Sequence, residues 1–202
     1  MKVRTKLFRK SRRHKKRKLF FPILIVFIAI IFFWKSKEVI NKSKAFDLII
    51  QETAKRHNVD SSLIKAIIDQ ESSFNPRAVG GVGEIGLMQL QMIVVEEWAK
   101  SQKINTPYRG SVFQPELNIE IGSWYYAKAL NRNKEYRYAE EMALCEYNAG
   151  RGATRKWAGW PPKNKNQNII DLIKFPQTKK YVKSIMKKYA KYAKEYKDEK
   201  NK

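Results

Sequence analysis

From Phe46 onward, apolar residues recur at the three- and four-residue spacing of helices that face a core. Five runs of this kind predict helices, which begin near Phe46, Asp60 or Ser61, Pro115, Ala139 and Pro176. Residues that favour helix ends follow two of them, because Asn58 comes after the first run and Gly150 after the fourth. The segment 45–192 is therefore predicted to be one mainly α-helical domain.

A glycine-rich stretch, AVGGVGEIGLMQLQ, separates the second predicted helix from the third. Four glycines within seven residues prevent a continuous helix and favour tight turns. We expect a short β-hairpin here, so that the predicted fold class is mainly α, of the α+β kind, with one small β element.

A different pattern precedes the domain. Residues 19–34, LFFPILIVFIAIIFFW, carry no charge and would span about 24 Å as a helix, close to the thickness of a hydrocarbon core. Residues 1–18 hold eleven Lys or Arg and no acid, which favours an amino terminus in the cytoplasm and a domain outside the cell membrane. We interpret 1–18 as a basic leader, 19–34 as a single transmembrane anchor, 35–44 as a tether and 193–202 as a basic tail. A buried core helix or a cleaved signal peptide remain alternatives for 19–34.

The net charge of +23 lies mainly at the two ends of the 202-residue chain. Residues 1–18 and 179–202 together supply +18 of it, and the middle supplies only +5. A nucleic-acid-binding domain would place its basic residues on the folded face that meets phosphate, so we expect no nucleic-acid partner. Cys145 is the only cysteine and His14 and His57 are the only histidines, which excludes an internal disulfide and argues against a metal site.

Glu71 is the most informative single residue. At 100° per residue, Ile64 lies about 20° from it and Ile67 about 40° on its other side, so Glu71 occupies the middle of the apolar stripe. Asp69, by contrast, is expected to point about 160° away into solvent. Apolar neighbours raise the pKa of a carboxyl group, as a general acid requires near neutral pH. The alternative is a core glutamate that caps the next turn, and the helix by itself does not decide between the two.

Three blocks in order, ESSFNPRA, GEIGLMQL and EYNAG, resemble the signatures of the soluble lytic transglycosylase (SLT) catalytic domain family, which has a lysozyme-like fold and cleaves peptidoglycan. The resemblance covers about residues 46–192 and includes a closing block whose Thr-x-x-Tyr-Val run matches TKKYV at 178–182. It implies that Glu71 is the sole catalytic acid and base. It also implies a sugar cleft whose substrate-binding residues are Gln89, Tyr147, Met88, Asn148 and Gln91.

The resemblance further implies cleavage of the β-1,4 bond between N-acetylmuramic acid and N-acetylglucosamine, with a 1,6-anhydromuramoyl product and no cofactor. Two departures stand out. Gly80 occupies a position where many relatives carry a serine that binds the sugar, and Glu84 replaces the usual alanine. Goose-type lysozymes carry an additional aspartate where this chain has Gln91, which favours the non-hydrolytic route.

Two alternatives to a transglycosylase stay open at this point. One is a hydrolytic lysozyme that uses Glu84 or a more distant acid together with water. The other is a non-catalytic module that binds peptidoglycan strands within an envelope-spanning assembly.

Overall fold

The computed structural model describes residues 26, 30, 33 and 42–200. Contacts divide the chain into two units, Met1–Asn41 and Lys42–Lys202. Val26, Ile30 and Phe33 are helical, but the rest of the predicted anchor, like the basic leader, lies outside the described residues. Among the described residues, no helix is both long and apolar enough to cross a bilayer.

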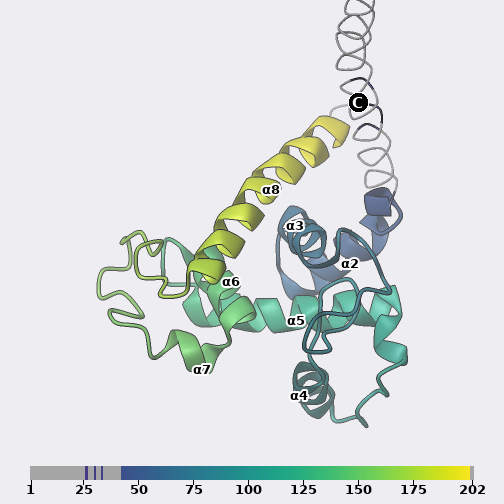
Figure 1. Cartoon of the computed structure of the whole chain (residues 1–202), viewed down its shortest axis with the longest axis horizontal. Coiled ribbons are helices and arrows are strands. Elements are labelled where there is room, and N and C mark those ends of the chain that lie inside the picture. The colour runs from purple at the N-terminus through teal and green to yellow at the C-terminus, as the bar shows by residue number, and fades with distance from the viewer. Residues whose placement is uncertain (1–25, 27–29, 31–32, 34–41, 201–202) are drawn as a thin grey trace, which may run out of the picture. The chain divides into compact units, whose positions relative to one another are not determined.

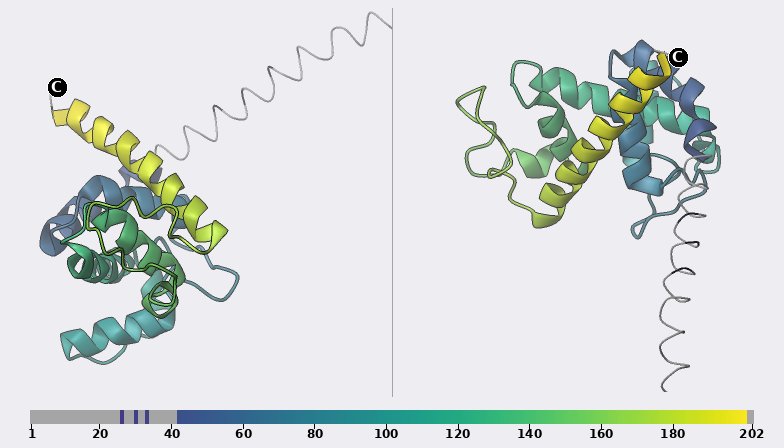
Figure 2. Two further views of the ribbon diagram at one scale, coloured as in Figure 1. Left: turned by 90° about the vertical axis from the view of Figure 1, so that its left-hand side faces the viewer. Right: turned by 90° about the horizontal axis from the view of Figure 1, so that it is seen from above.

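Helices joined by several long loops build the second unit, as Figures 1 and 2 show. They are α2 (Asp47–His57), α3 (Ser61–Ser72), α4 (Met92–Gln102), α5 (Pro115–Asn133), α6 (Ala139–Ala149), α7 (Arg151–Thr154) and α8 (Pro176–Lys200), with a 3₁₀ turn at Ser111–Phe113. The mainly α-helical prediction is confirmed. The helix α4 has no counterpart among the five predicted helices.

Local sequence explains where the helices begin and end. Asp60 caps α3 by accepting a hydrogen bond from the backbone N–H of Ser62 at 2.8 Å. Asn58 takes the left-handed conformation that ends α2, and Pro115 occupies the first turn of α5. Gly150 closes α6 with φ of 79°.

The predicted hairpin is reduced to two isolated antiparallel bridges, Val79 with Ile85 and Ile85 with Leu90, and the described residues contain no named strand. The reason lies in the side chain of Asn118, which is buried on α5. Its Nδ2 donates to the carbonyls of Ile85 and Val112, and its Oδ1 accepts from the backbone N–H of Met88. The Asn118 side chain thus holds the loop together with a few backbone hydrogen bonds, among them the reciprocal pair between Ile85 and Leu90.

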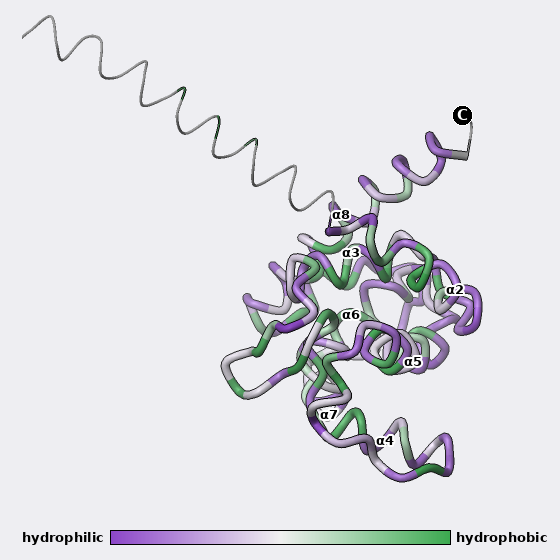
Figure 3. The backbone as a smooth tube through the Cα atoms, turned by 90° about the vertical axis from the view of Figure 1, so that its right-hand side faces the viewer, coloured by the Kyte–Doolittle hydropathy of each residue, from purple (hydrophilic) through white to green (hydrophobic). Residues whose placement is uncertain are grey.

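The core lies around α3, which packs along α8 and against α2, while α5 packs along α6. Leu63, Ile64, Ile67 and Ile68 of α3 are almost completely buried. Coloured by hydropathy, α8 alternates between polar and apolar segments, as expected for a helix with one face on the core (Figure 3). Asp69 corrects one expectation, since it is not directed into open solvent but is covered by Lys188 and Tyr192 of α8.

Candidate active site

Glu71 lies in the last turn of α3, directly after the buried apolar residues of that helix. Two residues that follow it, Ser73 and Phe74, have φ of 51° and 62° and turn the chain sharply away. The N–H groups of Ser73 and Asn75 in this turn donate to backbone carbonyls of Asp69 and Ser72. Glu71 therefore does not cap the next turn, which removes the structural alternative for this carboxylate.

The partner of Glu71 comes from the other end of the domain. The hydroxyl of Tyr181, on α8, donates a hydrogen bond to Glu71 Oε1 at 2.6 Å. Burial raises the pKa of Glu71 to about 7, the Tyr181 hydrogen bond opposes this rise, and the charge of Glu84 adds to it. Among the described residues, no Lys, Arg or His forms an ion pair with Glu71. The structure therefore places a carboxyl group that can hold a proton near neutral pH where one oxygen remains for a ligand.

A pocket of about 350 Å³ opens beside Glu71. It brings together residues from α3, α4, α5, α6 and the glycine-rich loop: Glu71, Glu84, Gln89, Leu90, Gln91, Ile93, Val94, Tyr125, Tyr147, Asn148, Ala149 and Gly150. Six of the seven side chains singled out from the sequence line this one pocket. Its wall combines aromatic rings with amides and carboxylates, a composition suited to sugar rings.

Gln89 is fixed as a hydrogen-bond acceptor. Its backbone has φ of 47°, and its Nε2 donates to the carbonyls of Gly86 at 2.9 Å and Ala78 at 3.3 Å. Both amide hydrogens are thereby directed into the loop. The carbonyl oxygen Oε1 is left to accept a hydrogen bond from a ligand in the pocket.

Tyr147 donates its hydroxyl hydrogen to the carbonyl of Met88 at 2.8 Å, and its ring lies 5.6 Å from that of Tyr125. The prediction that Met88 contacts substrate needs correction, because its side chain is completely buried and does not line the pocket. The Met88 side chain instead packs over Gly122 of α5, where a Cβ would clash with its sulfur. Met88 is a positioning residue for Tyr147.

The start of α8 fixes two residues of the pocket. Thr178 Oγ1 donates to Asn148 Oδ1 at 2.8 Å, one turn before Tyr181 reaches Glu71. Tyr181, which contacts Glu71, is not among the site residues predicted from the sequence. The signal that could have found it is its place in the Thr-x-x-Tyr-Val run.

A family model described as the Transglycosylase SLT domain matches residues 48–170. The membrane-bound lytic murein transglycosylase C of Cronobacter sakazakii is 35% identical over 134 residues, which are 62% of this chain and 36% of that protein. The chain spans about a third of the length of the curated relatives that it matches.

Two solved structures are similar in fold. One is an inactive mutant of lytic transglycosylase Slt from Pseudomonas aeruginosa, with a TM-score of 0.65 and 27% identity over 74% of this chain and 24% of that one. The other is a 70-kDa soluble lytic transglycosylase in complex with bulgecin A, with a TM-score of 0.61 and 26% identity over 75% of this chain and 24% of that one.

Proposed function

The chain belongs to the transglycosylase SLT domain family, and on this premise we propose that it is a peptidoglycan lytic transglycosylase with Glu71 as its one catalytic carboxylate. The observation that carries the proposal is the position of Glu71, which is half-buried at the wall of a pocket lined by Gln89 and Tyr147 and has no cationic partner within the part of the chain that the structure describes. The relative from Cronobacter sakazakii is named a lytic murein transglycosylase, which supports peptidoglycan as the substrate.

In the proposed reaction, protonated Glu71 donates its proton to the glycosidic oxygen between N-acetylmuramic acid and N-acetylglucosamine. Because Tyr181 occupies Oε1, the proton would leave from Oε2. The resulting carboxylate takes the proton of the muramoyl C6 hydroxyl, whose oxygen closes the 1,6-anhydro ring at C1. The substrate's acetamido group would support positive charge at C1 between these steps. Each cycle returns Glu71 to its protonated form, so no second carboxylate is required.

The remaining pocket residues would hold the glycan. Gln89 Oε1 would accept from a sugar hydroxyl or amide, Asn148 and Gln91 would contact the sugar at the open side, and the rings of Tyr147 and Tyr125 would pack against its faces. Gln91 is an amide and cannot act as a base toward water, which favours ring closure over hydrolysis.

Mass spectrometry of the products from purified murein tests this function. We expect disaccharide-peptides with 1,6-anhydromuramoyl ends. Reducing ends would instead identify a hydrolytic lysozyme in which Glu84 or another acid activates water. Binding of murein without any cleavage would identify a non-catalytic module of an envelope assembly.

We also propose that residues 19–34 anchor the chain as a single membrane span, with 1–18 in the cytoplasm and the catalytic domain on the periplasmic or wall side. The basic leader and the uncharged run support this, as does the name of the relative from Cronobacter sakazakii, a membrane-bound enzyme. Alkaline carbonate extraction of cell membranes should leave the full chain in the pellet. Release into the supernatant would contradict an integral anchor.

A further inference from the structure

The glycine-rich loop folds Glu84 back over Gly80. The backbone N–H of Gly80 donates to the carbonyl of Glu84 at 2.9 Å, and the N–H of Gly83 donates to the carbonyl of Gly80 at 3.1 Å. The N–H of Val82 donates to Glu84 Oε2 at 3.1 Å and so holds the carboxylate against its own turn. Glu84 is half-buried and lines the pocket of Glu71. It is therefore not a loosely solvated side chain between glycines.

The carboxylate of Glu84 fills the space that a side chain at position 80 would need. A Cβ on Gly80 would overlap Glu84 Oε2 and lie 2.9 Å from Glu84 Cδ. The adjacent Gly81 has nothing within 4 Å of its own Cβ position. Glycine at 80 and glutamate at 84 thus form a matched pair, because the first leaves the room that the second occupies.

Two acceptor oxygens converge on this point. The Cβ position of Gly80 lies 2.7 Å from Gln89 Oε1 and closer still to Glu84 Oε2. Within the part of the chain that the structure describes, only the N–H of Val82 donates to the Glu84 carboxylate, and no protein donor reaches Gln89 Oε1. Adjacent acceptors without a donor between them are favourable only when a ligand or water supplies one.

We propose that Glu84, seated over Gly80 beside Gln89, is a substrate-contacting residue of the cleft that accepts a hydrogen bond from a hydroxyl or acetamido N–H of the glycan. This inference rests on the proposed function. It assigns Glu84 to recognition of the glycan and not to activation of water. It also gives a physical reason for the glycine at position 80, where many relatives carry a serine. The Glu84 carboxylate, an anionic acceptor, takes the place that the neutral hydroxyl of a serine at position 80 would have.

The charge of Glu84 has a second consequence, for the pH dependence of cleavage. Among the described residues, the titratable groups that act on Glu71 or line its pocket are Tyr181 from α8, Tyr147 from α6, Tyr125 from α5 and Glu84 from the loop. Of these, Glu84 adds to the rise in the pKa of Glu71 that burial causes. Loss of the Glu84 charge should lower the pKa of Glu71, and the alkaline limb of activity should move to lower pH.

Steady-state cleavage of purified glycan strands by the full chain in detergent tests the proposal. We expect Glu84→Ala to raise KM about tenfold, as for the loss of one hydrogen bond to a charged acceptor. We expect Glu84→Gln to move the alkaline limb of kcat/KM down by about 0.5 pH unit, which is a loss of about threefold on that limb. Glu52→Gln, an exposed acid on α2 outside the pocket, is the charge-matched control and should change neither quantity.

Two glycine variants test whether the position of the Glu84 carboxylate depends on Gly80. Gly80→Ala should displace the carboxylate and raise KM about as much as Glu84→Ala does, whereas Gly81→Ala should have no effect. Unchanged KM and pH profile in both Glu84 variants would overturn the proposal, as would equal effects of the two glycine variants. The proposed function would fail separately, if wild-type protein gave no anhydromuramoyl product or if Glu71→Gln retained activity.

Discussion

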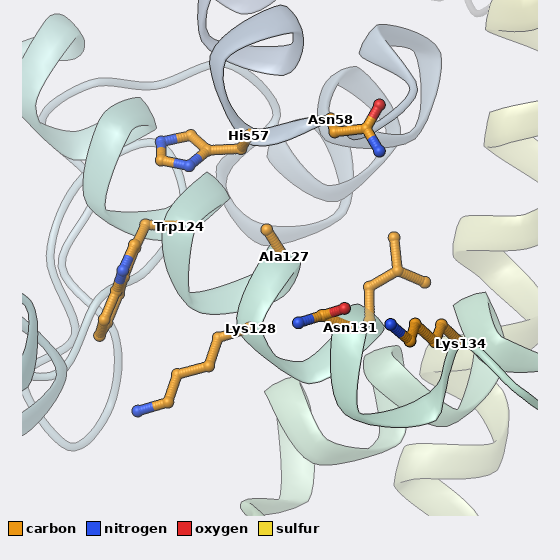
Figure 4. Close-up of a pocket in the computed structure, with 8 residues that line it drawn as sticks. His57, Asn58, Trp124, Ala127, Lys128, Asn131 and Lys134 are labelled. Atoms are coloured by element: carbon orange, nitrogen blue, oxygen red, sulfur yellow. The ribbon is translucent and has the colours of Figure 1, made fainter.

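Two pockets share the helix α5, and their comparison shows what distinguishes the proposed catalytic site from another cavity. One has about 350 Å³ and is lined by Glu71 and Tyr125. The other has about 450 Å³ and is lined by His57, Trp124 and Lys134 (Figure 4). Trp124 and Tyr125 are neighbours in sequence, with ring centroids 6.5 Å apart. Both pockets thus offer an aromatic ring with polar groups around it.

The two pockets differ in the partners of the charged side chains beside them. At the second pocket, His57 Nε2 lies 2.7 Å from Glu120 Oε1, and Lys128 is paired with Glu97. At the first pocket, the carboxyl of Glu71 is half-buried and, among the described residues, has no cation and accepts only the Tyr181 hydroxyl. An opposite charge nearby keeps a carboxyl ionised, whereas a desolvated carboxyl without a cation holds its proton to higher pH and can donate it. The pocket beside Glu71 is the smaller of the two, so volume does not single it out.

The strongest test of this contrast exchanges one carboxylate in each region. We expect Glu71→Gln to reduce murein cleavage by about 10³-fold or more, because the amide cannot donate a proton to the leaving oxygen. Glu120→Gln removes a carboxylate of the same size that is held by His57 and Arg56, and it should leave cleavage within about twofold. Release of soluble fragments from labelled murein measures both. Equal rates for Glu71→Gln and the wild type would end the assignment of Glu71.

A second effect of Glu71→Gln appears in stability. A pKa of about 7 in the folded state against 4.5 in the unfolded state means that the folded state binds more protons between these values. The wild type should therefore lose stability as the pH rises from about 4.5 to about 7, up to about 3 kcal/mol. The Glu71→Gln variant should not lose stability over this pH range. It should therefore be more stable than the wild type at pH 8 but not at pH 4.

Urea unfolding of both proteins in the same detergent, followed by tryptophan fluorescence, gives this difference. If the difference in unfolding free energy between the wild type and Glu71→Gln were the same at pH 4 and at pH 8, the Glu71 carboxyl would not be desolvated.

A smaller effect is expected at Tyr181. Because its hydrogen bond lowers the pKa of Glu71, Tyr181→Phe should raise this pKa and move the alkaline limb of activity to higher pH. The freed carboxyl should also lose its fixed orientation, at a cost of about tenfold in kcat. Tyr189→Phe is the matched control, since Tyr189 lies on the same helix but donates to Asp60. A shift of the limb to lower pH in Tyr181→Phe would contradict the account.

The smallest effect belongs to the second pocket. Lys134 lines it and is exposed, and Figure 4 shows it at the opposite side from His57. We expect Lys134→Ala to leave both the rate and the pH profile of murein cleavage unchanged. A fall in cleavage that matches the effect of Tyr181→Phe would give this surface a role in the reaction and weaken the distinction between the two pockets.

Sequence reasoning succeeded where a pattern is local. Helical periodicity alone placed Glu71 in an apolar stripe, and Asp60 and Pro115 marked helix starts that the structure confirms. The three sequence blocks supplied Gln89, Tyr147 and Asn148, which line the same pocket as Glu71. These features depend on neighbours within a few residues, or on a motif that keeps its spacing.

It did not succeed where contacts join distant segments. The bond from Tyr181 to Glu71 crosses 110 residues, and the side chain of Asn118 binds the backbone of the glycine-rich loop from about 30 residues away. Met88 faces the core because Gly122 on α5 leaves room for it. Glu146, another buried acid, is held by Arg132 and Asn133. Only the folded chain shows that Glu146 has cationic and amide partners and that Glu71 has only a tyrosine.

The most direct measurement is the titration of Glu71 itself. Carbon-13 NMR of the glutamate side-chain carboxyls, compared between wild type and Glu71→Gln, identifies the resonance of Glu71 and follows it with pH. We predict a midpoint of about 7, above the value of 4.5 for an ordinary glutamate. A midpoint at or below 4.5 would mean that Glu71 is ionised under working conditions and cannot be the proton donor.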